Sequence, residues 1–160
     1  MERENWLKTI YEAHHIAVFR FAYSIVHNTH LAEDVMQDTF LKAHRGFLDY
    51  QNRGTERAWL FQIARRTAYD ALKKRRREVS CDNTELITLA GPDEHTAETD
   101  LSELLRPLTP TDRDIVLLHV VAGLTHQEAA KALGRSVHSV KKRYERALCT
   151  LRAQLKEEKT

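Results

Sequence analysis

The chain has 160 residues, of which 42% are hydrophobic and 30% are charged, as is typical of a soluble globular protein with one domain or two small ones. No apolar run approaches the roughly 20 residues of a membrane span, and the charged N-terminus lacks the apolar core of a secretory signal. We therefore expect a cytoplasmic protein with no membrane insertion. The small net charge of +2 hides a strong alternation of sign along the chain.

The first 77 residues are basic, with 14 Lys/Arg against 9 Asp/Glu, and their apolar spacing predicts three helices. The first is expected over residues 5–27 and the second over residues 31–47, with a break at residues 28–30. The third is expected to start near Thr55 and to finish in the cationic run KKRRR at residues 73–77. Basic residues suit the last turn of a helix, but so many cations on one helix favour phosphate binding.

The next segment is acidic, since residues 78–105 hold 8 Asp/Glu and no Lys or Arg. Residues 78–101 also contain the only Gly-Pro pair and show no sustained apolar period. We expect an acidic linker there. A linker of this charge would be repelled by nucleic acid or would lie where nucleic acid otherwise goes, although a plain solvated linker has the same composition.

Residues 106–160 are basic again, with 11 Lys/Arg against 6 Asp/Glu, and residues 125–148 have the pattern of a helix-turn-helix. Thr125 and Glu128 form a predicted capping box, Gly134 ends the first helix and Ser136 caps the second. The apolar side of the second helix comprises Val137, Val140, Tyr144, Ala147, Leu148, Leu151 and Leu155. The expected DNA-binding side comprises Ser136, His138, Ser139, Lys141, Lys142, Arg143 and Arg146.

Catalytic and metal chemistry are not indicated. The sequence has no glycine-rich phosphate loop, no H-E-x-x-H and no G-x-S-x-G, and its nine histidines are scattered. Cys81 and Cys149 have no Cys or His neighbours at zinc-finger spacing. We expect a protein that is not an enzyme and has no cofactor, metal site or disulfide.

Three ordered blocks resemble the conserved regions of bacterial extracytoplasmic-function sigma factors. They are LAEDVMQDTFLKAH at residues 31–44, RAWLFQIARRTAYDALKKRRRE at residues 57–78, and the segment from LTPTDRDIVLLHVV through the helix-turn-helix at residues 108–152. The resemblance implies an all-α protein of two small helical domains, a region 2-like bundle at residues 1–77 and a region 4-like helix-turn-helix domain at residues 102–160. The acidic linker would join them.

The same resemblance implies partners and site residues. The partners would be core RNA polymerase, promoter DNA and an anti-sigma factor. Polymerase would contact Asp34, Gln37, Asp38 and Leu41. The minus-ten element would be opened and held by Arg57, Trp59, Gln62, Arg65, Arg66, Tyr69 and Lys73, although the neighbours of Trp59 favour a core role for that ring.

Two other functions fit parts of the sequence. A free-standing regulator could bind a palindromic operator as a dimer through the helix-turn-helix, and an interaction module could use its basic helices on RNA. The simple regulator needs neither the block at residues 31–44 nor the alternation of charge. The sequence therefore favours a sigma factor that directs polymerase to specific promoters and starts DNA opening.

Overall fold

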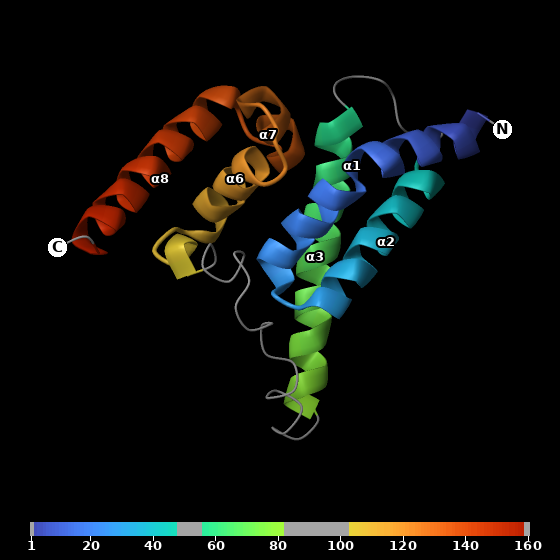
Figure 1. Ribbon diagram of the computed structural model, residues 1–160, viewed down its shortest axis with the longest axis horizontal. Helices are drawn as coiled ribbons and strands as arrows, with labels where there is room; N and C mark the ends of the chain where they lie inside the picture. Colours follow the sequence, from blue (N-terminus) through green and yellow to red (C-terminus); the bar gives the residue numbers. More distant parts are fainter. Residues whose placement is uncertain (1, 48–55, 82–102, 159–160) are drawn as a thin grey trace.

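The computed structural model describes residues 2–47, 56–81 and 103–158, and within these ranges all regular secondary structure is helical. The N-terminal half consists of α1 (Glu2–Val26), α2 (Thr29–Arg45) and α3 (Glu56–Cys81) (Figure 1). All three expected helices are present. Helix α2 begins two residues earlier than predicted because Asn28, expected within a break, is its N-cap and accepts the Leu31 N–H at 2.9 Å.

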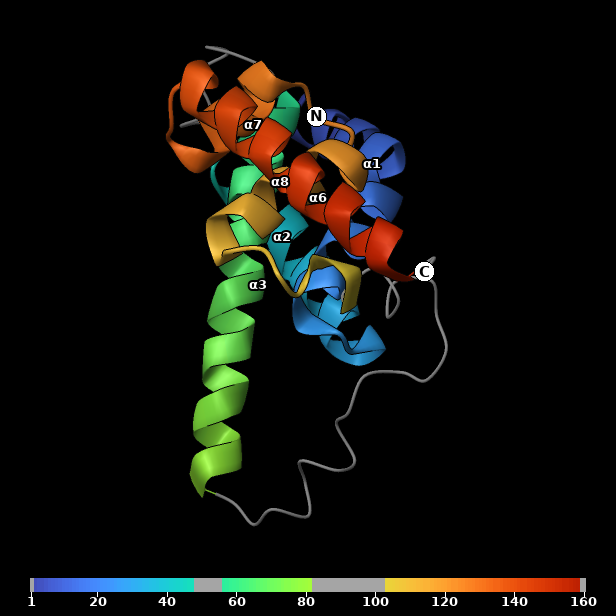
Figure 2. The ribbon, with the colours of Figure 1, turned by 90° about the vertical axis from the view of Figure 1, so that its left-hand side faces the viewer.

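Helix α3 continues four residues beyond the expected end at Arg77. Residues 78–81 of the predicted linker therefore lie within the helix, and residues 82–101 lie outside the described residues. Lys74 and Glu78 stand one turn apart with opposite charges, which favours continuation of the helix. The end of α3 that carries the cationic run projects beyond the other described helices (Figure 2).

The C-terminal half consists of α6 (Pro110–Val120), α7 (His126–Leu133) and α8 (Val137–Glu158). The capping box of Thr125 and Glu128 is present, and Gly134 ends α7 in the left-handed conformation at φ 66°. Ser136 caps α8, since its Oγ accepts the Ser139 N–H at 3.1 Å. These three predictions are confirmed. Helix α6 was not predicted from apolar spacing, although Thr109 followed by a proline at its first turn is a helix-start signal.

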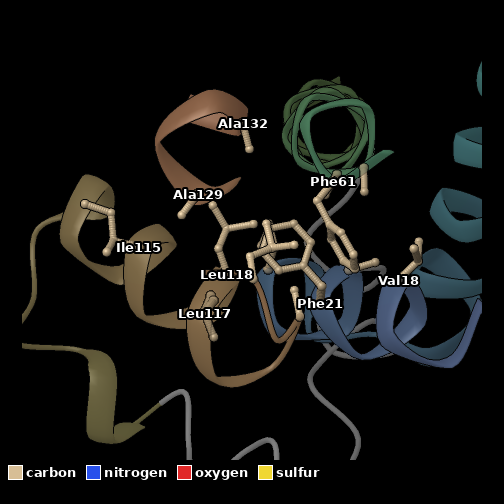
Figure 3. Close-up of a cluster of buried hydrophobic side chains, with 14 of the residues drawn as sticks. Val18, Phe21, Phe61, Ile115, Leu117, Leu118, Ala129 and Ala132 are labelled. Carbon is tan, nitrogen blue, oxygen red and sulfur yellow. The ribbon is translucent and has the colours of Figure 1, made fainter. Parts of the chain in front are cut away.

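One hydrophobic core runs through both halves of the molecule. Phe21 of α1 meets Phe61 of α3 edge-on, with ring centroids 5.6 Å apart, and both side chains are fully buried. Leu118 of α6 and Ala129 of α7 lie against the same cluster (Figure 3). Helices α6 and α7 thus pack onto α1 and α3, whereas α8 packs on α6 and α7.

Candidate nucleic-acid interface

The expected polymerase-binding residues lie on the outer side of α2. Asp34, Gln37, Asp38 and Leu41 are all exposed, and Leu41 is the most exposed apolar side chain of this helix at 52%. Asp34 and Asp38 also line an open groove of about 550 Å³ between α2 and α3. The groove carries both signs of charge, because Lys42, Lys74, Arg75, Asp70 and Glu78 line its other parts.

The expected minus-ten residues divide between two sides of α3. By helical spacing, Trp59, Gln62, Arg66 and Lys73 lie on one side. Trp59, Gln62 and Arg66 surround a hollow of about 300 Å³ together with Lys42 and Gly46. Gln62, Arg66 and Lys73 are exposed, so this side of α3 is open to a strand of nucleic acid.

Trp59 is partly buried and packs on other rings. Its centroid lies 5.9 Å from that of Trp6, and its ring edge lies beside Gly46, where an added Cβ would come within 3.2 Å of it. The position supports the core role favoured for Trp59 in the sequence, while one edge of the ring still borders the hollow beside Gln62.

The other side of α3 faces the C-terminal half. Arg65 Nε donates to Asp114 Oδ2 at 2.8 Å, and the Tyr69 hydroxyl donates to the second carboxylate oxygen, Oδ1. The Arg65 guanidinium also lies 5.3 Å from the centroid of the Tyr69 ring. Asp114 is 1% exposed, so its charge is compensated by these two groups rather than by solvent.

The pKa of the Tyr69 hydroxyl lies well above its usual range. Burial raises the pKa of its hydroxyl, and the charge and hydrogen bond of Asp114 raise that pKa further. Tyr69 is therefore a neutral donor to Asp114 throughout the physiological pH range.

Arg57 makes a second connection across the two halves. Its guanidinium donates to the carbonyl oxygen of Gly123 and, at 3.4 Å, to that of Ala122. Its Nε lies 3.7 Å from Oε2 of Glu128, the residue that completes the capping box of α7. Arg57 thus binds the turn that precedes α7 and the start of α7, the first helix of the helix-turn-helix.

The predicted DNA-binding side of α8 is largely open. His138, Lys142 and Arg146 recur every four residues opposite the buried Val140, Ala147 and Leu151, and all three are exposed. Lys141 is also exposed, and Ser139 is half-buried. Ser136 serves first as the helix cap.

Arg143 has a structural partner. Its Nη1 donates to Asp112 Oδ1 at 3.0 Å, which ties α8 to the first turn of α6. Asp112 is buried. The ion pair gives Arg143 a structural role in holding α8 on α6, and its predicted contact with DNA stays a prediction.

Asp112, Asp114 and Glu128 were not singled out as partners of cations by the sequence patterns. Carboxylates at the start of a helix have an ordinary explanation in the helix dipole. Asp112 lies 31 residues from Arg143 in the sequence, and Asp114 lies 49 residues from Arg65. Pairs this far apart leave no local pattern from which the pairing could be predicted.

A ring cluster in the C-terminal half was also missed. His119 of α6 stacks on His126 of α7 with centroids 4.9 Å apart, and Tyr144 of α8 closes the cluster. His119 Nδ1 lies 2.8 Å from the carbonyl oxygen of Leu124. Because a carbonyl oxygen can only accept a hydrogen bond, Nδ1 is the protonated ring nitrogen and donates to it. Burial and the neighbouring His119 and Lys141 lower the pKa of His126, and Glu145 partly opposes this effect.

The described ranges contain neither a metal-binding cluster nor a helix suited to a membrane. No three His, Cys, Asp or Glu side chains there are grouped so as to hold a metal ion. Likewise, none of the helices described here combines the length and the apolar character that crossing a bilayer requires.

Comparison with known proteins agrees with this arrangement. Residues 10–78 match the family model for sigma-70 region 2, and residues 98–151 match that for sigma-70 region 4. The chain is 33% identical to the RNA polymerase sigma factor SigV of Bacillus subtilis, over 88% of this chain and 85% of that one. It is 32% identical to the sigma factor EcfG of Rhodopseudomonas palustris, over 84% and 77%. The chain belongs to the extracytoplasmic-function sigma factors.

The solved structures support the same family. This sigma factor matches RpoE of Bartonella quintana, solved with the anti-sigma factor NepR, with a TM-score of 0.75 and 28% identity over 93% of this chain and 96% of that one. CnrH, solved with the cytosolic domain of CnrY, matches with a TM-score of 0.75 and 25% identity over 96% and 90%. The expected all-α fold of two helical domains is confirmed, and a free-standing operator-binding regulator is not favoured.

Proposed function

We propose that this sigma factor directs core RNA polymerase to its promoters through three surfaces. The outer side of α2, with Asp34, Gln37, Asp38 and Leu41, docks on a basic surface of the polymerase. Helix α3 holds the opened minus-ten element, and α8 reads the minus-thirty-five element from the major groove. The protein has no catalytic activity of its own in this proposal, and it acts in the cytoplasm because core polymerase acts there.

The main observation behind this proposal is the exposed side of α8. Its cap at Ser136 and its ion pair at Arg143 fix the helix, while His138, Lys142 and Arg146 point away from the buried side. A capped second helix of a helix-turn-helix, with cations opposite its core, is the arrangement that reads base edges near its N-terminus and phosphates further along.

Transcription with purified core polymerase tests this function. On a promoter library randomised in the minus-thirty-five region, His138→Ala and Lys142→Ala should change which sequences are used, with about 1–3 kcal/mol at stake for each good base contact. The exposed Lys156→Ala, near the far end of α8, is the control and should keep the wild-type preference. Absence of promoter-specific transcription by the wild-type chain would contradict the proposal, as would tight protection of a palindrome without polymerase.

An anti-sigma factor is also part of the proposal. The solved relatives RpoE and CnrH match nearly the whole of this chain, and RpoE was solved with the anti-sigma factor NepR. The three surfaces are exposed while the halves are together, so such a partner would act by covering one or more of them directly.

A further inference from the structure

The side of α3 that faces the C-terminal half has the chemistry of a single-stranded DNA site. Arg57, Phe61, Arg65 and Tyr69 recur every four residues along it. Phe61 is buried in the shared core, and the two arginines and the tyrosine flank it. Guanidinium groups bind phosphates, and an aromatic ring stacks on an unpaired base.

Carboxylates occupy this site in the structure. Asp114 accepts hydrogen bonds from Arg65 and Tyr69 with its two oxygens, and Glu128 lies 3.7 Å from Arg57. A carboxylate presents two anionic oxygens to a guanidinium much as a phosphate does. The acidic groups of the C-terminal half thus hold the positions that phosphates of a bound strand would need.

We propose that Asp114 takes the place of nucleic acid on α3, so that the C-terminal half and an unpaired DNA strand compete for Arg65 and Tyr69. This inference rests on the proposed function and adds to it a specific competitor for the minus-ten surface. Of the expected minus-ten residues, Gln62, Arg66 and Lys73 are exposed while the halves are closed, whereas Arg65 and Tyr69 are bonded to Asp114. The full surface becomes available when Asp114 leaves.

The ion pair of Asp114 and Arg65 opposes opening only weakly, whereas the shared apolar core around Phe61 favours the closed form. A buried ion pair contributes little net stability, because removing both charges from water costs nearly as much as their attraction returns. On opening, Asp114 regains water, and Arg65 and Tyr69 gain a phosphate and a base. A strand that binds only the open form has an apparent Kd equal to its intrinsic Kd divided by the fraction of molecules that are open.

Helix α6 supplies a matched pair of variants. Asp114 bonds an arginine of the other half, whereas Asp112, two residues earlier, bonds Arg143 within its own half. Asp114→Asn and Asp112→Asn therefore change net charge equally and differ in which contact they weaken. Asp114→Asn should bind fluorescein-labelled oligo-dT about tenfold more tightly than the wild type, whereas Asp112→Asn should not. Circular dichroism verifies that both variants are folded.

Two further measurements complete the test. Small-angle X-ray scattering of the full chain should show a larger radius of gyration when oligo-dT is added, because the strand separates the halves. Adding Arg65→Ala to Asp114→Asn should remove most of the gain in affinity. Equal gains for the two asparagine variants would show an effect of net charge alone, and binding without expansion would show that strand and closed form coexist; either result would overturn the proposal.

Transcription by the wild-type chain with core polymerase separates this inference from the proposed function. Promoter-specific transcription together with unchanged oligo-dT binding by Asp114→Asn would reject the competition and leave the function intact. Absence of transcription would reject the function itself.

Discussion

Arg143 and Arg146 lie three residues apart on α8 and have different surroundings. Arg143 is bonded to the buried Asp112, and Arg146 is exposed. Arg143→Ala leaves the Asp112 carboxylate without its guanidinium and should lower the free energy of unfolding by about 1–2 kcal/mol. Arg146→Ala should leave that free energy nearly unchanged, weaken binding to all promoters alike and reduce the salt slope by about one.

Urea denaturation and salt-dependent binding of the polymerase complex to promoter DNA measure the two effects. The assignment of Arg143 to structure fails if its alanine variant unfolds like the wild type while promoter binding weakens.

Three histidines should make the stability of the folded chain depend on pH. One of them is His126, which stacks on His119. Burial lowers the pKa of His126, and burial also lowers the pKa values of His14 and His27. As the pH falls through about 6.5, the unfolded chain takes up protons that the folded chain does not bind. The free energy of unfolding should therefore decrease between about pH 7.5 and pH 5.5.

His126→Phe keeps a ring beside His119 and Tyr144 but removes the titration. It should flatten part of this decrease, with the remainder due to His14 and His27. The exposed His138→Phe is the control and should follow the wild-type curve. Urea denaturation at several pH values measures the slopes, and an unaltered slope for His126→Phe would exclude the stack as a source.

At the scale of the element, the inner side of α2 packs in the core, and its outer side is the proposed binding surface for core polymerase. Ala32, Val35, Thr39, Phe40 and Ala43 are buried. Reversing the charge of both Asp34 and Asp38 should lower affinity for core polymerase by about tenfold, because their expected partner surface is basic. Helix content should remain, since exposed charges contribute little to stability.

Native gel shifts with core polymerase and circular dichroism test the role of α2. The double reversal of Glu4 and Glu12, which are exposed on α1, is the matched control and should leave core affinity unchanged. If the α1 variant loses affinity to the same extent, the effect comes from overall charge, and Asp34 and Asp38 lie outside the docking surface.

At the scale of the whole molecule, the shared core predicts cooperative unfolding. Phe21, Phe61 and Leu118 join the halves through one apolar cluster, so the loss of either half exposes part of the core of the other. Both tryptophans, Trp6 and Trp59, lie in the N-terminal half, whereas circular dichroism reports all helices. The two signals should follow the same urea transition. A loss of helix signal before the tryptophan signal changes would show that the halves unfold separately.

Much of the fold could be predicted because its rules are local. The capping box of Thr125 and Glu128, the left-handed Gly134 and the cap at Ser136 each depend on residues within a few positions of one another. Periodic apolar spacing identified α1 to α3 and α8 for the same reason. Helix α6 was missed because its residues 115–118 are all buried, so it has no polar side to produce a period.

The sequence by itself determined the helices other than α6, the helix-turn-helix and the family, since caps, apolar periods and motifs depend on neighbouring residues. Only the tertiary structure decided which cations are open to DNA. Arg57 reaches Gly123 across 66 residues, Arg65 reaches Asp114 across 49, and Tyr69 reaches the same carboxylate across 45. A guanidinium binds a carboxylate or a phosphate equally well, so its residue type and spacing predict an anion, and packing alone selects which one it meets.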